Sequence, residues 1–221
     1  MATSDFLNIE GLEERAKTLA AAFMLARGPR SARRAYLRRL KEDERVLRWA
    51  YRALADDVHR GEPITPATEW LLDNFHIAEA EFKRVRHDLP PSYHRRLPQL
   101  APRELAGRAR IYALAQELIQ HSDGRLDPER LVRFVTAFQT VAPLTIGELW
   151  AWPSMLKLGL IENLRSLAEG ILEGREQRLA AEAHLVPLEG GEMPLEPLPR
   201  TLHSAFVVHV LQRVRNRKSV V

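Results

Sequence analysis

The segment around residues 69–83 concentrates residue types that can do chemistry. Glu69, Asp73 and His76 recur at intervals of four and three, so on one helix they share a face that Lys83 extends. Carboxylate and imidazole groups at this spacing could share a cation or hold a sugar hydroxyl. We favour the alternative, a surface strip of charges that stabilises the helix, because one Asp-x-x-His lacks the second ligand pair of helical metal sites. We therefore predict no metal site and no cofactor.

Two asparagines are expected on partly buried helix faces. Asn74 lies beside the apolar row of the same segment, and Asn163 lies among the leucines of residues 156–167. Because a buried amide must be hydrogen-bonded, each could align helices or receive a partner, although we favour ordinary core amides. The candidates for a polar junction or a partner contact are Glu69, Asp73, Asn74, His76 and Asn163.

A stripe of six basic residues is the sharpest physical pattern. Their separations of 4, 3, 4, 3 and 4 place all six on one arc of a helix, opposite an apolar row; they are Arg34, Arg38, Lys41, Arg45, Arg48 and Arg52. Such a face suits the phosphates of anionic lipid or of nucleic acid. The alternative, which we favour, is a solvated face neutralised by Glu42, Asp43 and Glu44. Nucleic acid is disfavoured further, because the sequence shows no short helix–turn–helix.

Catalytic signatures are missing from the sequence. It contains no glycine-rich phosphate loop, no Gly-x-Ser-x-Gly, no His-Glu-x-x-His and no Asp-x-Asp. Cysteine is absent, which excludes a thiolate nucleophile, a disulfide and a Cys-based zinc site. We therefore predict no catalytic residue in this chain.

Composition narrows the class of protein. With 45% apolar residues in 221, the chain can bury a real core, which argues against disorder. The longest apolar run, residues 19–26, is too short to span a bilayer, and the acidic start is unlike a secretory signal. We expect a cytoplasmic protein.

The elements that must position these residues are helices. Helical period runs along almost the whole chain and strand signals are absent, so we predict an all-α bundle of five to seven helices. Cap signals at Thr65-Pro66, Asp127-Pro128 and Thr145 with Glu148 mark three helix starts. The predicted helices of the bundle span about residues 4–26, 31–59, 66–88, 102–120, 128–140, 146–153 and 154–184, and a separate C-terminal helix spans about residues 201–217.

Apolar residues in two of these segments predict burial. Trp70 and Ile77 widen the apolar row of residues 66–88 until it covers most of the helix, which we expect to be mostly buried. We interpret Trp150 and Trp152 as core packing around a kink at Pro153, rather than as a stacking platform.

The order of segments predicts three parts. Residues 1–186 form the bundle domain, residues 187–200 hold prolines, glutamates and glycines without hydrophobic period and form a linker, and residues 201–221 form an amphipathic C-terminal helix.

Long stretches of the chain resemble a known family. Residues 68–89 read TEWLLDNFHIAEAEFKRVRHDL, PPSYHRRLPQL follows, and residues 110–165 run from RIYALAQELIQHSDG to MLKLGLIENLR. Together these stretches resemble the N-terminal helical region of the cyclic β-1,2-glucan synthases, bacterial inner-membrane proteins. In that family the region precedes transmembrane segments, a glucosyltransferase domain that uses UDP-glucose, and a phosphorylase-like domain.

The resemblance implies a role in glucan synthesis without placing a catalytic residue here. The sequence lacks the metal-binding aspartates of the transferase and its Gln-x-x-Arg-Trp signature, which residues 46–49 only echo. We therefore expect a non-catalytic scaffold at the cytoplasmic face of the inner membrane, either part of a glucan synthase or a detached copy of this module. Its partners would be the membrane and transferase domains of a synthase. The alternative is a peripheral module that binds anionic lipid or nucleic acid through the basic stripe.

Overall fold

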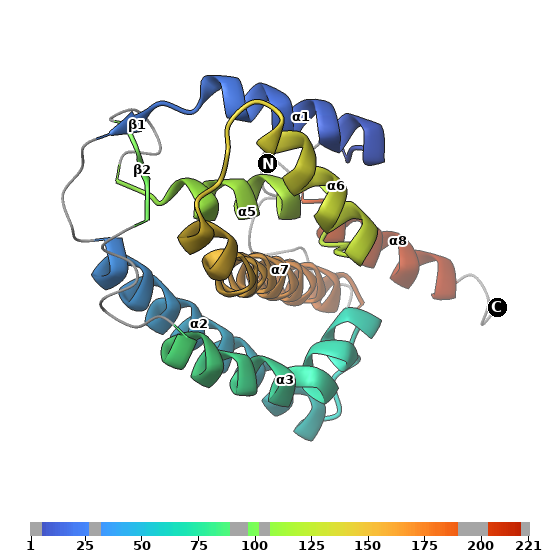
Figure 1. Ribbon diagram of the computed structural model, residues 1–221. Helices are drawn as coiled ribbons and strands as arrows, with labels where there is room; N and C mark the ends of the chain where they lie inside the picture. Colours follow the sequence, from blue (N-terminus) through green and yellow to red (C-terminus); the bar gives the residue numbers. More distant parts are fainter. Residues whose placement is uncertain (1–5, 27–31, 89–96, 102–106, 190–202, 218–221) are drawn as a thin grey trace. The chain divides into compact units, whose positions relative to one another are not determined.

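The computed structural model describes residues 6–26, 32–88, 97–101, 107–189 and 203–217 (Figure 1). These residues are mostly helical, which confirms the predicted all-α class. The helices are α1 (Ile9–Ala22), α2 (Ala32–His59), α3 (Pro66–Asp88), α5 (Arg110–His121), α6 (Pro128–Gln139), α7 (Ile146–Glu189) and α8 (Ser204–Arg217). Among the helices described, none combines the length and the apolar character that crossing a membrane requires.

The three predicted cap signals are confirmed. Thr65 Oγ1 accepts a hydrogen bond from the Thr68 N–H at 3.2 Å, and Asp127 Oδ1 accepts one from the Arg130 N–H at 2.9 Å. At the start of α7 the bonds are reciprocal, because Thr145 Oγ1 accepts from the Glu148 N–H while Glu148 Oε2 accepts from the Thr145 N–H.

The structure contains a short strand pair for which the sequence shows no signal, and the start of the fourth helix was predicted wrongly. β1 (Leu25–Ala26) pairs antiparallel with β2 (Gln99–Leu100), and the Leu100 N–H donates to the Arg108 carbonyl at 2.9 Å. Residues 102–106 of the helix predicted over 102–120 lie outside the described residues, and residues 107–109 are not helical, so α5 begins at Arg110. The first helix likewise spans less than residues 4–26, because Asn8 caps α1 and Leu25–Ala26 belong to β1.

The two helices predicted around Pro153 form one continuous helix, α7. Proline removes one backbone donor inside a helix but keeps a φ that a helix accepts. Ala151 and Met155 are buried on either side of Pro153, so packing keeps α7 continuous there.

α7 also continues past His184 to Glu189. Residues 187–189 of the predicted linker are therefore helical, and the rest of that linker lies outside the described residues. The predicted domain boundaries stay a prediction.

The chain divides into two compact units. The larger contains Met1–Trp49 and Asp73–Arg165, and within it α1 packs against α6 and α5 (Figure 1). Its core takes buried side chains from every helix, among them Leu12, Leu40, Leu47, Phe82, Leu114, Leu118, Phe134, Phe138 and Leu158.

The smaller unit contains Ala50–Leu72 and Ser166–Val221. Its buried residues include Leu54, Leu71, Ala168, Leu172 and Phe206. Asp57 of α2 bonds Arg175 of α7 through two hydrogen bonds, one of them 2.8 Å long. The His209 ring nitrogen Nε2 lies 2.7 Å from a Glu182 carboxylate oxygen, which joins α8 to α7.

Burial corrects the expectation for several large apolar residues. Trp70 and Ile77 are exposed on α3, and Trp150 is 74% exposed on α7, whereas Trp152 is half-buried. Helix α3 buries only its narrow row, because the other elements cover it on one side. The interpretation of Trp150 as core packing was therefore wrong.

The narrow row of α3 gives a stability prediction. Phe75 is 7% exposed and His76, next to it, is exposed. Phe75→Ala should lower the free energy of unfolding by about 3 to 5 kcal/mol, through lost burial and the cavity left behind. His76→Ala should change it by less than about 0.5 kcal/mol. Urea unfolding followed by circular dichroism measures both, and equal effects would contradict this assignment of the core face.

Candidate functional site

The acidic strip of α3 faces solvent. Glu69, Asp73, His76 and Lys83 are exposed, and the His76 Nδ1 lies 3.0 Å from the Asp73 carbonyl oxygen. Within the described ranges, no three His, Asp or Glu side chains gather so that they could hold a metal ion. These four residues therefore lie at the surface, which is where a strip of helix-stabilising charges is expected.

The two candidate asparagines are half-buried on different helices, Asn74 on α3 and Asn163 on α7. Asn163 lies beside the turn that follows α5, because a Cβ atom at Gly124 would be 3.6 Å from the Asn163 Nδ2. Neither amide reaches full burial. Each therefore remains a candidate for a contact at the surface rather than a deep junction.

The basic stripe of α2 is partly neutralised. Arg45 bonds Glu42 at 2.6 Å, and Arg48, which is half-buried, bonds Glu44 at 3.1 Å and also Glu79 of α3. Asp43, expected among the neutralising residues, is instead buried on the other side of α2, where it pairs with Arg165 at 3.0 Å.

The other described cations of the stripe are not neutralised in this way. Arg38, Lys41 and Arg52 are exposed, and none of them forms an ion pair with another described residue. The side chain of Arg34 lies outside the described residues. The stripe is therefore neither fully neutralised nor uniformly free.

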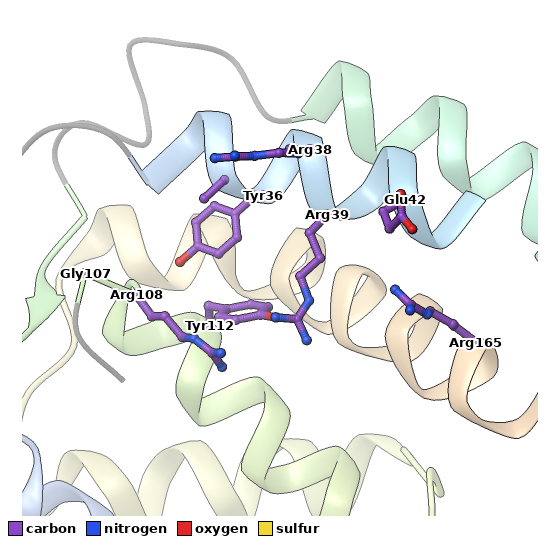
Figure 2. Close-up of a pocket in the computed structure, with 9 residues that line it drawn as sticks. Tyr36, Arg38, Arg39, Glu42, Gly107, Arg108, Tyr112 and Arg165 are labelled. Atoms are coloured by element: carbon purple, nitrogen blue, oxygen red, sulfur yellow. The ribbon is translucent and has the colours of Figure 1, made fainter. Parts of the chain in front are cut away.

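A pocket of about 620 Å³ opens beside the start of α2 (Figure 2). Its walls come from α2, from the turn before α5, from α5 and from α7. The lining residues are Ala35, Tyr36, Arg38, Arg39, Glu42, Gly107, Arg108, Tyr112 and Arg165. Four of these nine carry guanidinium groups, so the pocket presents positive charge from three separate segments.

A buried carboxylate holds one side of this pocket. Glu162 of α7 accepts hydrogen bonds from the Tyr112 hydroxyl at 2.6 Å and from the Gln116 amide at 2.7 Å, and it pairs with Arg39 at 2.5 Å. The ring of Tyr36 lies 4.9 Å from that of Tyr112, and its hydroxyl accepts the Ala109 N–H at 2.7 Å. The tyrosines are thus fixed by bonds at their hydroxyl ends.

Burial dominates the electrostatics here. It raises the pKa of Glu162 and of Asp43, against the opposing pull of Arg39 and Arg165. Burial also raises the pKa of Tyr36 to about 12 and raises the pKa of Tyr112, where the Glu162 charge adds to it. Both phenols therefore stay protonated at neutral pH, which suits hydrogen bonding rather than nucleophilic attack.

Sequence reasoning missed most of this pocket. Arg38 was identified as part of the stripe. Arg39, next to it on α2, is not one of the six residues of that stripe, and Arg108 and Arg165 come from distant segments. Glu42, named among the residues that neutralise the stripe, also lines the pocket, and Asn163 follows Glu162 on α7. Only folding brings Arg108 and Arg165 to the two arginines of α2.

No family model matches the sequence. Among curated proteins, the cyclic beta-(1,2)-glucan synthase NdvB of Rhizobium meliloti (strain 1021) is 36% identical to this chain over 187 residues. This chain is similar to a segment of a cyclic beta-(1,2)-glucan synthase. The similarity covers 80% of this chain, which confirms the resemblance seen in the sequence. It covers only 6% of the length of that glucan synthase, so most of the synthase sequence lies outside the matched segment.

The buried Glu162 gives a pH prediction for this segment. A carboxyl with a raised pKa holds its proton in the folded state above its ordinary value of 4.5, so wild-type stability falls as pH rises through that window. Glutamine does not titrate. The stability of Glu162→Gln relative to wild type should therefore rise as pH increases above about 4.5 in urea unfolding.

Glu42 provides the matched control. Its hydrogen bond with Arg45 lowers the pKa of this exposed carboxyl, so its contribution to stability is lost as pH falls. Glu42→Gln should therefore show a relative stability that falls as pH rises. Slopes of the same sign in the two variants would contradict the assignment of Glu162 as the desolvated group.

Proposed function

We propose that this chain is a non-catalytic helical module that acts in cyclic β-1,2-glucan synthesis as a scaffold at the cytoplasmic face of the membrane. The observation behind this proposal is the 36% identity to the glucan synthase over most of the chain. The partners we propose are the membrane and transferase parts of such a synthase.

The use of charged residues supports a scaffold. Many of the described ion pairs join different helices of the larger unit. Their charged side chains are therefore used to hold the fold together. Arg133 of α6 bonds Glu13 of α1 at 2.7 Å, and Lys157 of α7 bonds Glu81 of α3 at 3.1 Å. Arg15 of α1 likewise bonds Glu117 of α5. Pairs of this kind hold helices in a fixed register.

The start of α7 offers a surface for a partner. Ile146, Leu149 and Trp150 are exposed and, at spacings of three and four, share one face of the helix. Exposed apolar residues gathered on one face are typical of protein contacts. We assign this face, called the α7 apolar face from here, to the rest of the synthase.

The first test joins a cellular and a biochemical measurement. A strain lacking this chain should make several-fold less cyclic glucan, and wild type should restore it. Ile146→Ser with Trp150→Ser should fail to restore it, because the variant loses the α7 apolar face while keeping the core. The purified chain, incubated with labelled UDP-glucose and magnesium, should form no glucan and release no UDP.

Matched variants control for loss of apolar surface. Ile77 and Val132 are exposed apolar residues on α3 and α6, at 52% and 64%, and replacing both with serine should leave glucan production unchanged. Turnover by the homogeneous chain would overturn the non-catalytic assignment. Unchanged glucan in the deletion strain would overturn the role in glucan synthesis.

The second test concerns the membrane face, for which the exposed cations Lys41 and Arg52 are the supporting observation. Each basic residue near an anionic surface contributes about 1 kcal/mol, so Lys41→Glu with Arg52→Glu should weaken binding to phosphatidylglycerol vesicles more than about tenfold. Co-sedimentation measures this. Added salt should weaken wild-type binding, and neutral vesicles should not bind.

The control reverses two exposed cations outside the stripe, Lys83 and Arg125, and should lose much less binding. Equal losses in both variants would reduce the effect to net charge and would contradict a membrane-facing α2. Tighter retention of duplex DNA than of vesicles, with a steep salt dependence, would favour the alternative of a nucleic-acid module.

A further inference from the structure

We propose that the pocket between α2, α5 and α7 binds a phosphate group. This goes beyond the scaffold role and stands on different residues from the membrane test. The pocket is lined by four guanidinium groups and has room for more than an orthophosphate, since its volume of about 620 Å³ lies within the usual range for small-molecule sites.

Two of the four arginines bring charge that no carboxylate offsets in the part of the chain that is described. Arg38 is exposed and forms no ion pair there. Among the described residues, Arg108 donates to a neutral partner, the Gln116 amide oxygen at 2.9 Å, and its guanidinium lies 5.9 Å from the Tyr112 ring centroid. Both groups keep donors for an incoming anion.

The other two arginines are held in place by acids behind the pocket. Arg39 pairs with Glu162, whose side chain is 10% exposed, and Arg165 pairs with Asp43, which is 1% exposed. Such buried partners fix a long side chain before any ligand arrives. Figure 2 shows the Arg39 and Arg108 guanidinium groups on either side of Tyr112, with Arg165 approaching from α7. The cations are therefore preorganised.

The charge balance favours an anion. Among the described residues that line the pocket and their ion-pair partners, five guanidinium groups (Arg38, Arg39, Arg45, Arg108, Arg165) accompany three carboxylates (Glu42, Asp43, Glu162). When all three acids are ionised, two positive charges remain. A doubly charged phosphate ester or pyrophosphate matches this excess, and planar guanidinium forks suit its oxygens.

The aromatic residues argue against a stacked sugar or base as the recognised group. Tyr36 is 4% exposed and Tyr112 is 1% exposed, so neither presents a ring face for stacking. Their rings instead form an apolar floor that excludes water beneath the cations and strengthens charge-assisted hydrogen bonds. The phosphate, and not the group attached to it, is what this pocket recognises.

Titration calorimetry of the full chain with inorganic pyrophosphate tests the proposal. We expect one site per chain and a rise in unfolding temperature with ligand. Arg38→Gln with Arg108→Gln should weaken binding at least about tenfold, since each lost charge-assisted hydrogen bond contributes more than a neutral one. Neither residue anchors a buried carboxylate, so this variant should fold, and Arg38→Gln alone should already weaken binding.

A charge-matched control separates the pocket from the stripe. Lys41→Gln with Arg52→Gln removes two exposed cations of the same helix that do not line the pocket, and it should bind pyrophosphate within about twofold of wild type. Equal loss in both variants, or unchanged binding after loss of Arg38 and Arg108, overturns the site. Absence of pyrophosphate binding to wild type also overturns it.

Vesicles distinguish the source of the phosphate. Phosphatidate vesicles present the same group on a lipid, and retention that depends on Arg38 and Arg108 supports a headgroup site. Pyrophosphate binding without such retention supports a soluble phosphate ester. Glucan production in cells is measured separately. Failure of phosphate binding therefore leaves the scaffold proposal standing, and failure of the scaffold proposal leaves this one standing.

Discussion

The buried ion pair between Arg110 and Glu148 is the interaction on which the larger unit depends. Arg110 donates to both carboxylate oxygens, at 2.9 and 2.7 Å, and Glu148 is fully buried. The pair also bonds backbone: Arg110 donates to the Pro143 carbonyl, and Glu148 accepts from the Thr145 N–H and hydroxyl. One pair thus joins the start of α5, the α6–α7 connection and the first turn of α7. Such a pair adds little net stability over apolar residues, but leaving one partner alone is costly, so we infer that it fixes which helix ends meet.

The same two helices, α5 and α7, that the Arg110–Glu148 ion pair joins also carry residues of the pocket. Tyr112 follows Arg110 by two residues on α5, so the ion pair that holds Arg110 also fixes where the Tyr112 ring lies along this helix. Glu162 follows Glu148 by fourteen residues on α7, which is close to four turns and returns it to the same side of the helix. The hydrogen bond between Tyr112 and Glu162 is a second contact between the same two helices. Arg39 reaches this second junction from α2 and brings the basic helix to the pocket.

Local signals in the sequence predicted the fold well wherever a helix end is decided by adjacent residues. Thr65-Pro66, Asp127-Pro128 and the Thr145 to Glu148 box each satisfy backbone donors within four residues, so they could be read without the tertiary structure. The strand pair could not, because Leu25 and Leu100 lie far apart in the chain. Trp150 misled for a related reason: residue type suggests burial, but only the arrangement of helices decides it. Of the pocket's cations, only Arg38 belongs to a pattern in the sequence. Arg39 follows it on α2 without being part of the stripe, and Arg108 and Arg165 join these two only in space.

Arginine does three kinds of work in this chain, and lysine would serve none of them equally well. The sequence has five lysines among 33 basic residues, so arginine supplies the other 28. A planar fork can bond two carboxylate oxygens at once, as Arg110 does in the core and Arg133 does on Glu13 between helices. The same fork, held by a buried acid as Arg39 is, leaves donors pointing outward for a ligand. Structural pairing and anion binding are therefore compatible in one residue type, because the acid that orients the guanidinium occupies only part of its five donors.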